Sequence, residues 1–183
     1  MTNWQRDPRW GNIKLGFSDT YIRDYGCTVS VIGNILNITP DVVNEKLKSV
    51  NGFAYGNLVI WAKIAEAFPG VTVNRVWTYN NDDVKANVPN VIVEVPAKAI
   101  GGTGKHWVQF IGNHICRDPW TGQERPVSDF LQYGDPTGYC IIKGVVVPPV
   151  PPSDYDLEQK IRQILGTGID PRLHIAQIRD LLK

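Results

Sequence analysis

The 183-residue sequence lacks the features that mark several large classes of protein. No run approaches the roughly 18 consecutive apolar residues that a helix needs to cross a bilayer, so no membrane span is expected. Charge of one sign is not in excess either: 19 Lys and Arg against 18 Asp and Glu give a net charge of +1, and the basic residues are scattered singly. Without a basic patch there is little attraction for phosphates or anionic lipids. Nucleic-acid binding is therefore not expected.

The sequence starts with MTNWQRDPRW, which is polar and aromatic and lacks the apolar core of a secretory signal peptide. We therefore expect synthesis in the cytoplasm. Any release or export would then use a route other than the Sec pathway.

Cysteine and histidine are also scarce. Three widely spaced cysteines, Cys27, Cys116 and Cys140, are an odd number, which argues against a disulfide framework and fits a reducing compartment. With three histidines and no CxxC or HExxH pattern, neither a zinc site nor any other cofactor is expected. The remaining question is whether one of these thiols is reactive.

Helical patterns dominate the first part of the chain after an irregular segment, residues 1–25. The apolar run 27–36 could be a strand or a helix, and its length favours a helix. A second helix is predicted from Pro40, with Thr39 as N-cap and Val43 and Leu47 on one face. A third is predicted over 57–68, where apolar residues recur at steps of three and four and Pro69-Gly70 follows.

Strand patterns follow these helices. Short apolar or alternating runs predict strands at residues 71–77, 91–95, 106–112, 114–118 and 139–147. Because the helices come first and the strands afterwards, the sequence predicts an α+β fold with N-terminal helices packed on an antiparallel sheet.

A proline-rich segment divides the chain. Residues 148–153 contain four prolines and predict an extended, semi-rigid linker between a domain at 1–147 and a helical hairpin at 154–183. A hairpin of this size is too small to fold alone. Its apolar faces would therefore dock on the domain, on a second copy in a homo-oligomer, or on a dedicated partner.

Cys27 is the candidate nucleophile. It follows Gly26 at the start of the predicted helix 27–36, where the helix dipole lowers the pKa of a thiol. Cys116 and Cys140 lie within strand-like apolar runs, where a buried and inert thiol is expected. The pattern around Cys27 is equally that of a small apolar residue in a core, so the sequence alone leaves both roles open.

His106 and Asp118 are the candidate partners of that thiol. His106 follows the flexible segment GGTGK at the start of a strand. If the strands at 106–112 and 114–118 form a hairpin, Asp118 lies near His106 and can fix its tautomer. The alternative is that Asp118-Pro119 only begins a turn. We expect the other histidines, His114 and His174, to be surface or interface residues.

Four segments, QRDPRWG, YGCTVSVIGNIL, GKHWVQFIG and RDPWTGQERPVSDF, resemble in order and spacing the double-glycine (bacteriocin-leader) peptidases, a family of papain-like cysteine peptidases. The resemblance covers about residues 4–145. It implies a papain-like fold in which Cys27 is the nucleophile, His106 the general base and acid, and Asp118 the orienting carboxylate. Gln5 would donate its side-chain amide to the oxyanion, with the Cys27 N–H as second donor.

The residues beside the nucleophile and the base, Gly26, Thr28 and Trp107, are the expected substrate contacts. Two departures from the family limit what the resemblance implies. Thr28 stands where the family often has glycine, and the sequence has no ATPase motif of the kind fused to bacteriocin exporters.

Two functions remain open at this point. The first is an active cysteine peptidase of a bacterium or phage that cleaves a peptide, a protein or the peptide stem of cell-wall peptidoglycan. The second is a catalytically inactive, peptidase-like binding or structural module of a phage or bacterial assembly.

Overall fold

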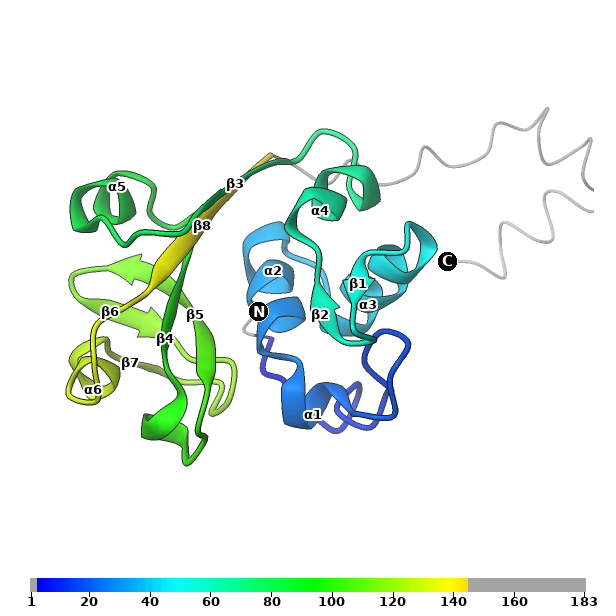
Figure 1. The fold of residues 1–183 in the computed structure, drawn as a ribbon, viewed down its shortest axis with the longest axis horizontal. Helices are drawn as coiled ribbons and strands as arrows, with labels where there is room; N and C mark the ends of the chain where they lie inside the picture. Colours follow the sequence, from blue (N-terminus) through cyan, green and yellow to red (C-terminus); the bar gives the residue numbers. More distant parts are fainter. Residues whose placement is uncertain (1–2, 145–183) are drawn as a thin grey trace, which may run out of the picture. The chain divides into compact units, whose positions relative to one another are not determined.

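The computed structural model describes residues 3–144 of the chain. Within this range the fold is α+β, with helices and a six-stranded antiparallel sheet, as predicted (Figure 1). The N-terminal helices lie on one face of the sheet, and two shorter helices lie on the other. The predicted linker at 148–153 and hairpin at 154–183 lie outside the described residues. Of the residues that are described, none forms a helix with the length and hydropathy needed to cross a membrane.

The helical half, which we define as residues 3–68, holds four helices and a two-stranded hairpin. The elements are α1 (Ile22–Tyr25), α2 (Cys27–Leu36), α3 (Pro40–Ser49), β1 (Phe53–Ala54), β2 (Leu58–Val59) and α4 (Trp61–Ala67). The predicted helix 27–36 is confirmed residue for residue. Thr39 is the N-cap residue of α3, but its hydroxyl makes no capping hydrogen bond, and Val43 and Leu47 are buried as expected.

The helix predicted over 57–68 is wrong in its first turn. Leu58 and Val59 form β2 and pair with Ala54 and Phe53, and the helix starts only at Trp61. Tyr55 and Gly56 make the turn of this hairpin, both with positive φ angles. Leu58 fits the helical spacing of apolar residues in the sequence, yet its backbone pairs with the neighbouring strand.

The sheet half, residues 71–144, contains the strands in the order β3-β8-β4-β5-β6-β7, and every neighbouring pair is antiparallel. The strands are β3 (Thr72–Val76), β4 (Val91–Pro96), β5 (Lys105–Gly112), β6 (Ile115–Arg117), β7 (Glu124–Pro126) and β8 (Gly138–Lys143). Five strands were predicted. The sequence did not predict β1, or α1, which lies within the segment expected to be irregular. Nor did it predict β7 and the short helices α5 (Asn81–Ala86), η1 (Ala97–Ile100) and α6 (Ser128–Leu131).

Two hydrophobic cores cover the two faces of the sheet. Between the helices and the sheet, Ile32 of α2 and Ile64 of α4 pack in one cluster with Ile92 and Trp107. On the other face, Val84 of α5 and Phe130 of α6 join Val93, Val95, Val108 and Phe110. Since side chains alternate along a strand, neighbouring residues of β4 and β5 serve different cores. Helix α2 packs directly against β5 (Figure 1), which brings the start of α2 next to the start of that strand.

Candidate active site

Cys27 is the first residue of α2, and its side chain is partly exposed. Gly26 ends α1 and begins α2, so the two helices meet at one residue. A Cβ at position 26 would lie only 2.4 Å from the carbonyl oxygen of Ile22. Only glycine therefore allows α1 to run this closely into α2, and this close passage fixes where the Cys27 thiol emerges.

His106 and Asp118 lie together, as the predicted hairpin requires. Strands β5 and β6 pair antiparallel, with Phe110 opposite Cys116 and Gln109 opposite Arg117. His106 Nε2 lies 2.8 Å from Asp118 Oδ1, and both side chains are buried. The bond fixes the orientation of the ring and leaves Nδ1 for the thiol. Asp118-Pro119 also begins a turn, since the Gly122 N–H donates to the Asp118 carbonyl.

The carboxylate of Asp118 is fully surrounded by donors. Its Oδ1 also accepts from the Trp120 N–H at 2.9 Å, and its Oδ2 accepts from the Thr121 hydroxyl at 3.2 Å and from Arg125 at 3.5 Å. Burial by itself would raise the pKa of Asp118. Hydrogen bonding to His106, the charge of that ring and the charge of Arg125 outweigh burial and lower the pKa, so the carboxylate is ionised.

Cys27 and His106 shift each other's pKa values in the directions that favour their charged forms. Burial would raise the pKa of the Cys27 thiol, but hydrogen bonding to His106, its positive charge and the Trp107 N–H lower it overall. Burial would lower the pKa of His106, but Asp118 and Cys27 raise it to about 9. Both shifts favour transfer of the thiol proton to the ring. The product is a thiolate beside an imidazolium, which is the reactive form of a catalytic cysteine.

Gln5 lies in the same site, and only 1% of its surface is exposed. Its Nε2 donates to the Arg23 carbonyl at 3.0 Å, which leaves a second N–H on that nitrogen, because a carboxamide carries two donors. Its Oε1 is buried without a partner among the described residues. The Gln5 backbone N–H donates to the Pro119 carbonyl at 2.8 Å, so this residue is tied to the turn that carries Asp118.

A cleft of about 990 Å³ opens over these residues. The helical half supplies one wall and the sheet half the other. The lining includes Gln5, Cys27, Thr28, Leu58, His106, Trp107 and the segment Gly101–Lys105. Because a volume of this size exceeds a single side chain, the cleft can hold several residues of an extended chain next to the thiol.

Two of the three predicted substrate contacts line this cleft. Thr28 has its hydroxyl 3.9 Å from the Cys27 sulfur, and Trp107 forms part of the opposite wall. Trp107 is fixed by Trp61, whose ring centroid is 4.8 Å away, and by the guanidinium of Arg75. Gly26 does not line the cleft. The structure places it behind Cys27, as the point where α1 meets α2.

Several lining residues were not predicted from the sequence, among them Asp24, Asn57, Leu58, Glu94 and Trp120. The GGTG segment was noted as a flexible approach to His106, but it is also a wall of the cleft. Trp120 lies in one of the motifs that carry the family resemblance and could have been found there. Asn57 and Leu58 could not, because they were assigned to a helix.

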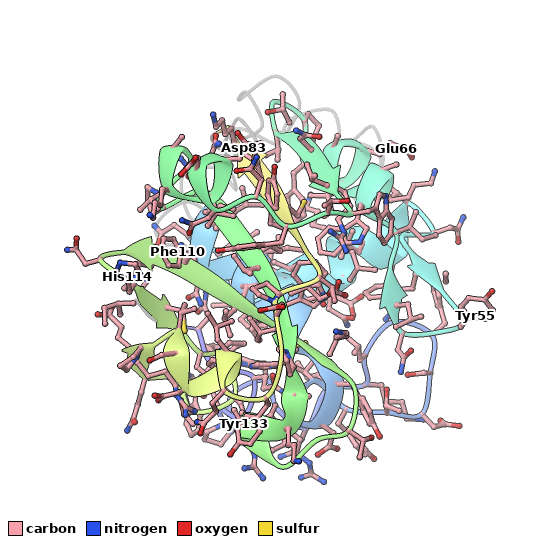
Figure 2. All side chains as sticks on the ribbon, turned by 60° about the vertical axis from the view of Figure 1, so that its left-hand side comes forward. Tyr55, Glu66, Asp83, Phe110, His114 and Tyr133 are labelled. Carbon is pink, nitrogen blue, oxygen red and sulfur yellow. The ribbon has the colours of Figure 1, made fainter. Side chains whose placement is uncertain are left out.

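The remaining candidates lie elsewhere. His114 sits at the tip of the β5–β6 turn and points away from the body of the domain (Figure 2). Cys116 and Cys140 are buried, and burial raises the pKa of each thiol to about 12. Between residues 3 and 144, no three His, Cys, Asp or Glu side chains gather as metal ligands.

A scan against models of protein families and a search of curated proteins found no match to this chain. The case for a function therefore depends on the residues of the site and their geometry.

Proposed function

We propose that the protein is a cysteine peptidase of the papain-like type, with Cys27 as nucleophile, His106 as base and acid, and Asp118 as the group that orients His106. One observation carries the proposal. His106 bonds Asp118 through Nε2 at 2.8 Å, and it lines the same cleft as Cys27 at the start of α2. A histidine oriented by a carboxylate beside a thiol can take the thiol proton and later give it to a leaving group.

The chemistry follows from these positions. The Cys27 thiolate attacks the carbonyl carbon of an amide, and the C=O π electrons move to oxygen as an oxyanion. The second Nε2–H of Gln5 and the Cys27 N–H are the proposed donors to this oxyanion. The His106 imidazolium protonates the amide nitrogen as the C–N bond breaks, which leaves a thioester and releases an amine. His106 then takes a proton from water, whose oxygen attacks the thioester and frees the carboxylic acid and the thiolate.

The proposed substrate is a peptide, a protein or the peptide stem of peptidoglycan, because the cleft has room for several residues and holds apolar side chains beside polar groups. The second candidate function is an inactive binding module on the same fold. The lowered pKa of Cys27 and the raised pKa of His106 favour the enzyme, because a module that only binds has no use for an activated thiol.

Labelling with iodoacetamide over a series of pH values tests this proposal. We expect rapid alkylation of Cys27 in the folded protein from a pH well below 8, located by mass spectrometry of its peptides. Cys116 and Cys140 serve as internal controls, since they should react only after unfolding. Equal labelling of all three thiols, or none before unfolding, would show that Cys27 is not activated.

Cleavage assays then identify the substrate. Wild-type protein and the variant Cys27→Ala would be incubated with unfolded protein substrates and with purified peptidoglycan, and new amino groups would be counted. We expect release with one of these substrates, and none with the variant. An activated Cys27 with no release from either would favour the inactive module.

A further inference from the structure

The imidazole of His106 also contacts side chains that have no part in the proposed chemistry. On the face of the sheet away from α2, its ring stacks on that of Phe130, with centroids 5.9 Å apart and planes inclined by 30°. Phe130 is fully buried in α6. The guanidinium of Arg125 lies over the same phenyl ring, 4.8 Å from its centroid. Arg125, Phe130 and His106 therefore belong to one packed group.

Arg125 also contacts Asp118 directly. It belongs to β7, opposite Cys116 of β6, and its Nη1 lies 3.5 Å from Asp118 Oδ2. Its Nε bonds Asp129 Oδ2 of α6 at 2.9 Å. Among residues 3–144, Arg125 is the one arginine or lysine paired with Asp118. It therefore holds the carboxylate oxygen on the side away from His106.

We propose that Arg125 is a positioning residue of the site: through Asp118 and Phe130 it holds the ring of His106 and sets the pH range in which that ring stays protonated. The inference rests on the proposed function, since it assigns a role to a residue of the same site. Two separate contacts carry it. A side chain needed only for packing on Phe130 has no reason to point its charge at Asp118.

The direction of the effect follows from the charges. The positive charge of Arg125 offsets part of the negative charge of Asp118, and it repels a protonated His106. Removing that charge leaves Asp118 a stronger partner for the imidazolium, so His106 should hold its proton to higher pH. The other charged or titratable groups near His106 are Cys27 of α2, Cys116 of β6, Asp129 of α6 and, along the cleft, Asp24, Glu94 and Lys105.

The test compares pH profiles of the variants Arg125→Gln, Arg125→Lys and Asp118→Asn. The ring of His106 would be followed by NMR over the pH series, and the alkylation rate of Cys27 measured in parallel. For Arg125→Gln we expect the titration midpoint of His106 to rise by about half a pH unit, a small shift because solvent screens a partly exposed charge. For Arg125→Lys it should move less, and for Asp118→Asn it should fall.

Arg117→Gln is the matched control. The side chains of Arg117 and Arg125 are 24% and 25% exposed. Arg117 precedes Asp118 in the chain, but its guanidinium pairs with Glu124 at 2.8 Å and forms no ion pair with Asp118. It should move the midpoint by less than half as much. If Arg125→Gln fails to fold, Asp129→Asn replaces it. Without the negative charge of Asp129, the positive charge of Arg125 acts on Asp118 alone. The titration midpoint of His106 should therefore fall.

An unchanged or lowered midpoint in folded Arg125→Gln overturns the proposal, as does an unchanged midpoint in Asp129→Asn. A shift in Arg117→Gln equal to that in Arg125→Gln overturns it as well. The midpoint of His106 is measured without any substrate. Failure of the proposed function would appear instead as an unreactive Cys27 in the wild-type protein, so the two failures are distinguishable.

Discussion

At the scale of single residues, Cys27 and His106 must carry opposite charges at the same time, and this sets the pH dependence of any reaction at the site. As pH rises through the lowered pKa of Cys27, the thiolate forms and the rate should increase. As pH rises through about 9, His106 loses its proton, the leaving amine lacks its acid, and the rate should fall.

We therefore predict a bell-shaped profile of kcat/KM whose basic limb lies near pH 9, measured with any substrate that the cleavage assays identify. Asp118→Asn should move this limb to lower pH, because the imidazolium loses its anionic partner. The two limbs belong to the coupled pair rather than to either residue alone. A rate that only rises up to pH 10 would contradict a role for His106 as acid.

Gln5 allows a second prediction at this scale. Gln5→Ala should lower kcat by about 10²–10³-fold, because the oxyanion loses a donor that is already in place. Alkylation of Cys27 by iodoacetamide should keep its wild-type rate, since that reaction forms no oxyanion. Asn3→Ala is a matched control. The Asn3 amide is also buried, donates to one carbonyl (Ile38) and leaves its oxygen without a partner, but it does not line the cleft.

Asn3→Ala should lower the melting temperature to a similar degree as Gln5→Ala while kcat stays near the wild-type value. If Gln5→Ala slows alkylation as strongly as it slows turnover, Gln5 serves the structure of the site rather than the oxyanion.

At the scale of elements, the junction of α1 and α2 determines where the nucleophile lies. In Gly26→Ala the new methyl group would meet Ile22, with its carbonyl oxygen at 2.4 Å and its Cγ2 at 2.6 Å. The helices must move apart, which should cost about 1–3 kcal/mol in the free energy of unfolding. The thiol should also react more slowly with iodoacetamide, because it moves away from His106.

Gly104→Ala is the comparison for this change, measured by the same chemical denaturation. A Cβ at position 104 would meet nothing within 4 Å, so stability should stay within about 1 kcal/mol of the wild-type value. A Gly26→Ala protein as stable as wild type would mean that the junction can relax without cost.

At this scale, some helices and strands could be predicted from the sequence and others could not. Helix α3, with one apolar face, and strands with long apolar runs, such as β4 and β5, were found because burial repeats within each element. Helix α2 was ambiguous by its pattern and was predicted from the length of its apolar run. The β5–β6 hairpin was found from its turn, and it brought Asp118 to His106. These are local patterns, and the α+β arrangement follows from their order along the chain.

The missed elements are short and fixed by contacts distant in sequence. Strand β7 has three residues and exists because it pairs with β6. In α6 only Phe130 is buried, so no repeating pattern marks it. Arg125 and Phe130 lie on these two elements, and their relation to His106 appears only in the folded chain. The start of α5 could have been predicted from its N-cap residue, since the Asn80 side chain accepts from the N–H groups of Asp82 and Asp83.

At the scale of the whole molecule, the cleft opens between the helical half and the sheet half, which share one core. A ligand that fills it must contact both walls. We predict that a reversible peptide aldehyde, which forms a hemithioacetal with Cys27, slows hydrogen exchange at Gly102–Lys105 and Asn57–Val59 together. The outer surface of α3, around Val42 and Ser49, serves as the internal reference and should not change.

Protection of only one wall would contradict a cleft that holds an extended chain across the nucleophile. Protection that also appears in Cys27→Ala would show that binding does not need the thiol.

The contact between Gln5 and Pro119 also bears on synthesis of the protein at the ribosome. The residues of the site are spread along the chain, and the base and its carboxylate are made long after the nucleophile. While a nascent chain carries Cys27 but not yet His106 and Asp118, its thiol has no imidazolium beside it and keeps ordinary reactivity. A reactive thiolate can therefore form only after the sheet half has been made and has packed against the helices.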